Sequence, residues 1–135
     1  MAVVWTVVLL SICGVVEPPG IDFQEGNVLQ ARELAAQSGK MVLVEIYASW
    51  CASCLLMEQT TLRSSPVIER VTSDFIAVRL NADEPEGKLF AIEHNVQMLP
   101  ALIVTTSKGN VISQVEEALG QVEMIRFLDT CGRTR

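Results

Sequence analysis

Apolar residues recur along the chain with two different periods, one typical of helices and one typical of buried strands. Between residues 28 and 35 they fall three and four positions apart, directly after Asn27, a residue type that caps helices, and the segment ends at Ser38 and Gly39. Residues 41–47 and 75–80 are instead continuous apolar runs rich in β-branched side chains, which is typical of central strands covered on both faces. This pattern predicts a layered α/β domain.

The remaining segments continue the alternation of helices and strands. We expect further helices at residues 51–62, 66–71, 87–93 and 122–131. Strands are expected at residues 101–106 and 111–115. The two strands are joined by a polar turn at residues 107–110, which predicts an antiparallel hairpin. With the short helix at residues 66–71 counted together with the helix before it, the expected order is helix, strand, helix, strand, helix, strand, strand, helix, an α/β sandwich around a mixed sheet.

The first 16 residues carry no charged side chain. They are shorter than the roughly 18 residues of a spanning helix, and they fit the apolar region of a secretory signal peptide better. An uncleaved anchor, a lipidation site at Cys13, the last span of a longer protein and a buried element of a soluble protein also remain open. Pro18 and Pro19 interrupt regular structure, so we expect residues 1–20 to be a signal peptide or membrane anchor and residues 21–135 to be the folded domain.

Composition excludes several classes of protein. The chain has 135 residues, which is one domain's worth, and half of them are hydrophobic, which excludes a disordered chain. The formal net charge of -6 argues against a nucleic-acid partner, because a phosphate backbone needs a basic surface. Four cysteines are too few for a scaffold held together by disulfides.

Two of those cysteines carry the clearest functional signal, in the stretch Cys51-Ala52-Ser53-Cys54. Thiols three residues apart at the start of a helix can close a disulfide and reopen it. Cys51 lies where unpaired N–H groups and the helix dipole stabilise a thiolate, so we expect it to be the exposed nucleophile. Cys54, one turn further on, is then the resolving thiol that releases a mixed disulfide.

A metal site is the main alternative for such a pair. A structural zinc ion needs four ligands, and the remaining candidates, Cys13, Cys131 and His94, are not paired at ligand spacing. A strand, a loop, the cysteine pair and a helix in this order favour redox chemistry over metal binding. We therefore predict no metal site, while delivery of Cu(I) or Zn through the two thiols stays open as a third hypothesis.

Residues 47–54, the Leu99-Pro100 step and Asn81-Ala82-Asp83 resemble the thioredoxin superfamily, and most closely the C-terminal periplasmic domain of DsbD-type thiol:disulfide interchange proteins. The resemblance covers most of residues 38–130. It implies a thioredoxin-like three-layer α/β/α sandwich in which Pro100 is a cis-proline facing the cysteines and the backbone of Leu99 pairs with an extended partner peptide. Ala52 and Ser53 replace the Gly-Pro of ordinary thioredoxins, so the direction of electron flow stays open.

Two acids and one aromatic residue complete the predicted site. Glu45 interrupts an apolar strand, and a buried carboxyl with a raised pKa can exchange a proton with a thiol near neutral pH. Glu58 follows Cys54 by four residues, and its charge on the same helix face would raise the thiol pKa of Cys51. The alternatives are a strand-edge Glu45 that reaches water and a solvated Glu58. Trp50 is expected to shield Cys51 and to offer partner chains an apolar contact.

These residues predict an enzyme, a thiol:disulfide oxidoreductase of the protein-disulfide reductase type, located outside the cytoplasm in the periplasm. Its partners would be protein thiols and disulfides together with a membrane electron donor, with membrane contact through residues 1–16. We expect no bound cofactor, because the reducing equivalents are held by the Cys51 and Cys54 dithiol. The alternative function is a membrane-tethered peptide-binding module of thioredoxin fold, with an inert disulfide.

Overall fold

The computed structural model describes residues 20–132. The expected signal peptide or anchor, including Cys13, lies almost wholly outside this range, so the division of the chain at residue 20 stays a prediction. Of the helices between residues 20 and 132, none is both long and apolar enough to cross a membrane.

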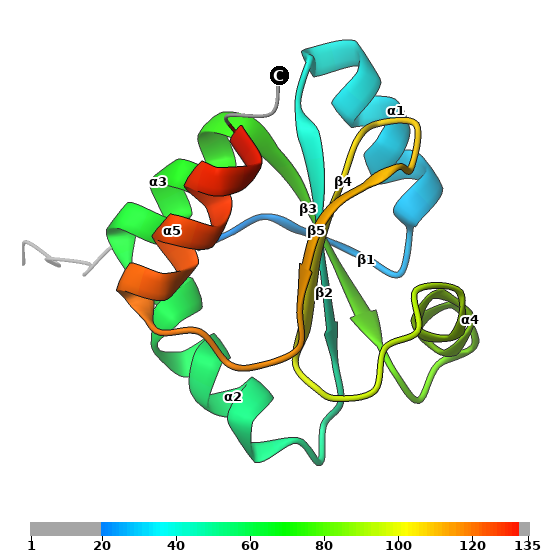
Figure 1. Ribbon diagram of the computed structural model, residues 1–135, viewed down its shortest axis with the longest axis vertical. Helices are drawn as coiled ribbons and strands as arrows, with labels where there is room; N and C mark the ends of the chain where they lie inside the picture. The colour runs from blue at the N-terminus through cyan, green and yellow to red at the C-terminus, as the bar shows by residue number, and fades with distance from the viewer. Residues whose placement is uncertain (1–19, 133–135) are drawn as a thin grey trace, which may run out of the picture.

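A five-stranded mixed sheet forms the centre of the domain (Figure 1). Its strands are β1 (Phe23–Glu25), β2 (Met41–Tyr47), β3 (Phe75–Asn81), β4 (Ala101–Thr105) and β5 (Val111–Val115). They lie in the order β1-β3-β2-β4-β5, with β1 and β2 parallel to β3. Strand β4 runs antiparallel to β2 and forms the predicted hairpin with β5.

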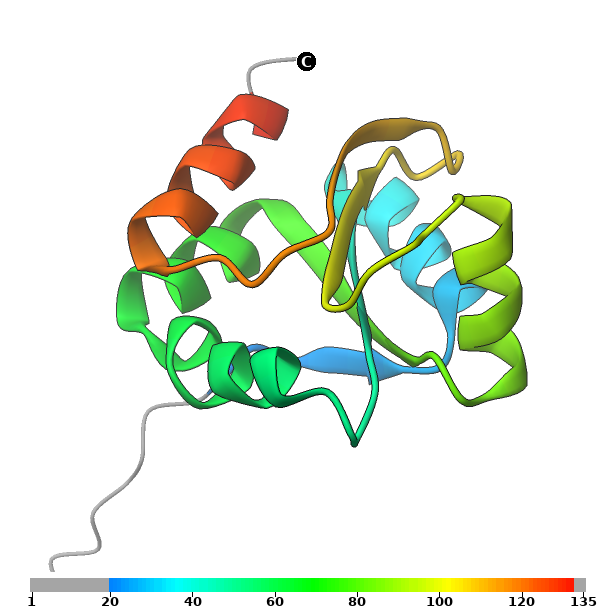
Figure 2. The same cartoon turned by 60° about the horizontal axis from the view of Figure 1, so that its bottom comes forward.

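Helices cover both faces of this sheet, as Figures 1 and 2 show from two sides. One face is covered by α1 (Val28–Ser38) and α4 (Pro85–Glu93), and the other by α2 (Ala52–Gln59), α3 (Ser65–Asp74) and α5 (Gln121–Gly132). The predicted α/β/α sandwich is therefore confirmed.

Helix α1 begins and ends where the sequence places it. The Oδ1 atom of Asn27 accepts a hydrogen bond from the N–H of Gln30 at 2.9 Å. Gly39 ends the helix with a φ of 67°, a left-handed conformation that glycine adopts without the clash of a Cβ atom. Both predicted helix signals are confirmed.

The structure differs from the sequence prediction in two elements. Strand β1 was not predicted, because its three residues include the polar Gln24 and Glu25 and pair only with β3 at the sheet edge. The helix expected over residues 51–62 ends at Gln59 and is followed by a 3-10 turn, η1 (Thr61–Arg63). There the Thr61 hydroxyl donates to the carbonyl of Leu119 at 2.7 Å, a tertiary contact that local sequence does not predict.

The alternation of side chains along β2 assigns its residues to two separate cores. Val42, Val44 and Ile46 pack toward α1 and α4, whereas Met41 and Leu43 pack toward α2, α3 and α5. Because successive side chains of a strand point to opposite faces, Glu45 shares the face of Met41 and Leu43. The one acidic residue of this strand therefore lies on the face that α2 covers.

Candidate redox site

The cysteine pair lies at the junction between the carboxyl end of β2 and the start of α2. Cys51 is the N-cap residue of α2, and its Sγ forms a disulfide with Cys54 across a Cα–Cα distance of 5.3 Å. The Cys54 N–H donates to the Cys51 sulfur at 3.2 Å. The first sulfur therefore lies at the positive end of the helix dipole, where a thiolate is stabilised.

Cys51 is more deeply buried than the sequence predicts. It exposes 7% of its surface and Cys54 exposes 1%, so the expectation of an exposed Cys51 is wrong. The pair packs with Ala48, and with Tyr47, Ala82 and Leu99 around it. Ala82 and Leu99 come from segments distant in sequence, and the first sulfur is largely closed to solvent.

The loop before β4 faces this pair. The Leu99–Pro100 peptide bond is cis, and the Leu99 side chain packs against the cysteine cluster. Ser53 links the two segments: its Oγ lies 3.4 Å from the Cys51 sulfur and donates to the Leu99 carbonyl at 3.4 Å. Sequence reasoning gave Ser53 no role beyond its place in the CxxC motif, yet it contacts both the reacting sulfur and the loop.

Trp50 is fixed by a hydrogen bond although it lies at the surface. Its indole Nε1 donates to Asp83 at 2.9 Å, while 70% of the residue remains exposed. Met98, next to the cis bond, is also 65% exposed. The structure thus presents apolar surface immediately before Cys51 and immediately before Leu99, as a partner-binding role for Trp50 requires.

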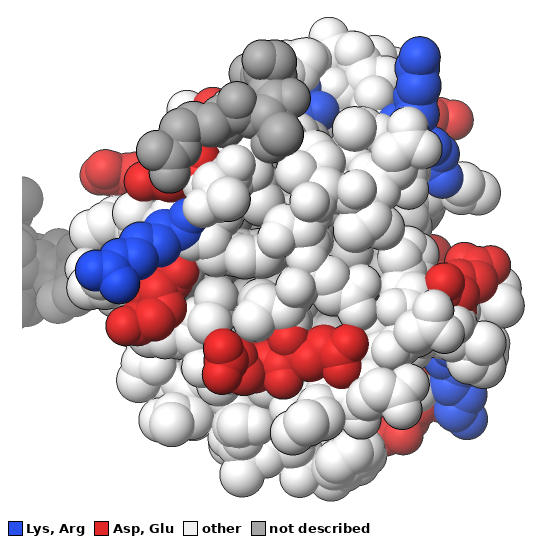
Figure 3. Space-filling view, in the orientation of Figure 1, with Lys and Arg blue, Asp and Glu red and all other residues white. Residues whose placement is uncertain are grey.

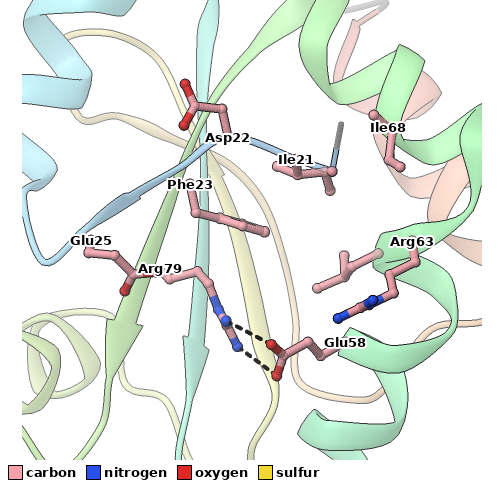
Figure 4. Close-up of a pocket in the computed structure, with 10 residues that line it drawn as sticks. Ile21, Asp22, Phe23, Glu25, Glu58, Arg63, Ile68 and Arg79 are labelled. Atoms are coloured by element: carbon pink, nitrogen blue, oxygen red, sulfur yellow. Dashed lines mark hydrogen bonds and ion pairs between the residues drawn. The ribbon is translucent and has the colours of Figure 1, made fainter. Parts of the chain in front are cut away.

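Glu45 lies fully buried beneath α2, in register with Arg79 on the neighbouring strand. Arg79 Nε lies 3.0 Å from Glu45 Oε2, and the two terminal nitrogens of Arg79 donate to the two oxygens of Glu58, each at 3.2 Å. Figure 4 shows this bidentate contact between β3 and α2, with Phe23 beside the guanidinium. One cation therefore joins the two predicted acids.

The pKa of Glu45 is raised from 4.5 to about 7. Burial is the largest cause, because it disfavours the charged form, and the negative charge of Glu58 adds to it. The charge of Arg79 acts in the opposite direction. Neither oxygen of Glu45 accepts a well-formed hydrogen bond within residues 20–132. The expectation of a buried acid that titrates near neutral pH thus agrees with this geometry, and the strand-edge alternative does not.

Glu58 has a partner that the sequence did not predict. Its carboxylate pairs with Arg79, so a positive charge offsets the negative charge that was expected to act on Cys51. Its side chain is 40% exposed, whereas that of Arg79 is 13% exposed. An effect of Glu58 on the thiol pKa of Cys51 remains a prediction. Because Glu58 and Glu45 both pair with Arg79, the charge of Arg79 is part of that effect.

Arg79 is the residue that sequence reasoning missed. Its guanidinium also lies over the ring of Tyr47, 4.1 Å from the centroid, which adds a cation–π contact. The available signal was a lone charge in the apolar strand at residues 75–80, matching the lone acid in the strand at residues 41–47. Two lone charges of opposite sign on neighbouring, otherwise apolar strands indicate an ion pair.

An open cavity of about 670 Å³ lies beside this network (Figure 4). Residues from β1, β3, α2, η1 and α3 line it, among them Phe23, Glu58, Arg63, Ile68 and Arg79. Glu45 is not part of its wall. Solvent in the cavity therefore reaches the Arg79–Glu58 pair but not the buried acid.

The metal alternative finds no support in the placement of its candidate ligands. Within residues 20–132, no group of three or more His, Cys, Asp and Glu side chains is arranged to hold a metal ion. Cys131 is buried on α5, and the His94 ring stacks on Phe90, with its Nδ1 atom 2.9 Å from the Phe90 carbonyl oxygen.

The sequence model described as thioredoxin-like matches residues 24–107. The chain belongs to the thioredoxin-like family. A thioredoxin from Chlorobaculum thiosulfatiphilum is 29% identical over 96 residues, which are 68% of this chain and 80% of that protein. The thiol:disulfide interchange protein DsbD of Pseudomonas fluorescens is 28% identical over 107 residues, or 78% of this chain. The chain spans only 18% of the length of that DsbD.

Solved structures agree on the fold. A putative disulphide-isomerase from Bacteroides thetaiotaomicron superposes with a TM-score of 0.75 at 21% identity, covering 86% of this chain and 96% of that one. Together with the Cys51–Cys54 disulfide, the family membership identifies a thioredoxin-like oxidoreductase of the thiol–disulfide type that resembles DsbD domains, with protein thiols and disulfides as the implied substrates.

Proposed function

We propose that this protein is a reductase or interchange protein that passes electrons from the Cys51–Cys54 dithiol to disulfides of other proteins. The observation that carries the proposal is the position of the pair: a disulfide at the N-terminus of α2, facing the Leu99–Pro100 loop and backed by a buried acid. The disulfide described here is then the oxidised product of one reaction cycle.

The first step is attack by Cys51. In the dithiol form, the Cys51 thiolate attacks one sulfur of the substrate disulfide, forming a mixed disulfide and expelling the other substrate sulfur as a thiolate. The α2 dipole and the N–H of Cys54, whose nitrogen lies 3.2 Å from the Cys51 sulfur, favour the anionic form of the nucleophile. The exposed Trp50 gives the partner chain an apolar contact during this step.

Cys54 completes the exchange. Its thiol must lose a proton before its sulfur attacks Cys51, closes the intramolecular disulfide and expels the second substrate thiolate. Glu45 lies on the sheet face covered by α2, and with a pKa of about 7 it can accept that proton near neutral pH. Two electrons pass to the substrate in this exchange, and Glu45 holds the proton that Cys54 loses.

The proposal includes a location and a source of electrons. We propose that the protein acts outside the cytoplasm, in the periplasm, because the first 16 residues are uncharged and mainly apolar. We also propose that a membrane electron donor reduces the Cys51–Cys54 disulfide, and that no bound cofactor takes part. The 28% identity to DsbD proteins supports both parts, although the chain matches less than a fifth of their length.

Trapping of reaction intermediates tests the proposal. The full chain should reduce insulin disulfides with dithiothreitol as the electron source, and Cys54→Ser should accumulate a mixed disulfide through Cys51. The matched control, Cys51→Ser combined with Cys54→Ser, should trap nothing. A Cys54→Ser variant that traps no substrate, together with a Cys51→Ala variant as active as the wild type, would refute the proposal.

Burial of both sulfurs favours a second candidate. With Cys51 only 7% exposed, the same surface can serve as a peptide-binding module whose disulfide does not react. This candidate predicts peptide binding that is unchanged when both cysteines are replaced by serine, whereas the reductase loses its activity in that variant.

A further inference from the structure

The loop between α4 and β4, residues 94–100, contains no helix or strand, yet its Leu99 side chain packs against the cysteine pair. Backbone N–H groups in such a loop need partners elsewhere. The N–H groups of Gln97 and Met98 both donate to one oxygen of Glu116, at 2.8 and 2.9 Å. The loop is thus tied to a residue that follows β5 at once.

A second side chain completes this attachment. The amide nitrogen of Gln114 donates to the other Glu116 oxygen at 2.9 Å and to the His94 carbonyl at 3.1 Å. Gln114 is itself fixed, because it pairs with Ile103 in the β4–β5 hairpin. The hydrogen bonds therefore run from the rigid hairpin through Gln114 and Glu116 to both parts of the loop.

The charge of Glu116 suits this role. Hydrogen bonds to a carboxylate are shorter and stronger than those between neutral groups, and two successive N–H groups form a natural site for an anion. These bonds, first that from Gln97 and then those from Gln114 and Met98, lower the pKa of Glu116, so it remains ionised at neutral pH. Figure 3 shows acidic side chains gathered over the connection between β5 and α5, where Glu116 and Glu117 lie side by side in sequence.

We propose that Glu116 is a positioning residue for substrate binding, which holds the backbone of Gln97 and Met98 so that Leu99 and the exposed Met98 side chain meet an extended substrate peptide. The inference rests on the proposed function. It assigns Glu116 no contact with the reacting sulfurs. Its loss should therefore weaken the binding of a polypeptide substrate and leave the chemistry of the disulfide itself unchanged.

Glu116→Ala compared with Glu117→Ala tests this role. Glu117 is exposed and carries the same charge, but it makes none of the loop contacts described here, so it is a matched control. If the untied loop adopts the binding conformation for one fifth of the time, KM for insulin rises about fivefold while kcat is kept. Glu116→Gln, which retains neutral acceptor capacity, should fall between wild type and Glu116→Ala.

Two further readouts separate positioning from a general loss of structure. Amide hydrogen exchange at Gln97 and Met98 should accelerate in Glu116→Ala only, and reduction of the Cys51–Cys54 disulfide by dithiothreitol should keep its wild-type rate in both variants. If the KM for insulin is equal in Glu116→Ala and Glu117→Ala, the proposal is overturned, even if amide exchange at Gln97 and Met98 differs between the two variants. Absence of insulin reduction by the wild type refutes the proposed function instead, and unchanged exchange at Gln97 and Met98 then overturns the positioning role by itself.

Discussion

Replacement of Glu45 by Gln should remove a loss of stability that the wild-type protein undergoes as pH rises through neutrality. Burial raises the pKa of this carboxyl from 4.5 to about 7. Between these values the unfolded chain has released the proton while the folded protein still holds it. The free energy of unfolding therefore falls as pH increases through this window, and it levels off above about pH 7.

The size of the effect follows from the two pKa values. Each pKa unit corresponds to about 1.4 kcal/mol, so the full cost of ionising Glu45 in the folded protein is about 3 kcal/mol. Most of it, roughly 2.5 kcal/mol, develops between about pH 5 and about pH 8. Glu45 is 0% exposed, so solvent screening does not reduce this value.

Urea unfolding of the disulfide form at about pH 5 and at about pH 8 measures the cost of ionising Glu45. The disulfide form is used because no thiol of the Cys51–Cys54 pair titrates in it. Glu45→Gln should lose about 2.5 kcal/mol less stability than the wild type between the lower and the higher pH. Glu33→Gln, an exposed site with the same change of charge, should behave as the wild type does. Equal losses in wild type and Glu45→Gln would refute the raised pKa and, with it, the role of Glu45 as proton acceptor.

Three other substitutions test the candidate site and the packing of the helices and strands around it. Arg79→Leu removes the cation 3.0 Å from Glu45, so the Glu45 pKa should rise above 7 by roughly one unit or more in an NMR titration of its carboxyl group. Trp50→Ala should change the free energy of unfolding by less than about 0.5 kcal/mol, because the residue is 70% exposed, but should raise KM for insulin about fivefold. Gly87→Ala should cost about 1–3 kcal/mol in urea unfolding, since its new Cβ would lie 1.9 Å from the Asn81 carbonyl oxygen.

Local patterns were enough to predict most of the fold. The helix after Asn27, the two buried strands and the final hairpin each carry a signal within a few residues, and the structure contains all of them. Strand β1 has no such signal, because only its pairing with β3 makes it a strand. The 3-10 turn after α2 likewise contains a contact with the distant Leu119 that no local pattern predicts.

The candidate site divides in the same way. The cysteine pair and the buried Glu45 stand out in sequence, because a CxxC motif and a lone acid in an apolar strand are unusual. The pairing of Arg79 with Glu45 depends on the register between β2 and β3, and the role of Glu116 depends on hydrogen bonds to a loop about 20 residues earlier in the chain. The burial of Cys51 depends on packing between segments that are remote in sequence, so no local pattern predicts it.

On the proposed mechanism, Cys51 and Cys54 form a reversible redox centre whose dithiol form donates electrons. Its reduction potential, measured by equilibrating the full chain with defined ratios of reduced and oxidised dithiothreitol or glutathione, tests this directly. A protein-disulfide reductase should have a potential near that of reducing dithiols, about -270 mV, and clearly more negative than the roughly -120 mV of strong oxidants. A value well below about -300 mV would mark a structural disulfide and would contradict the claim.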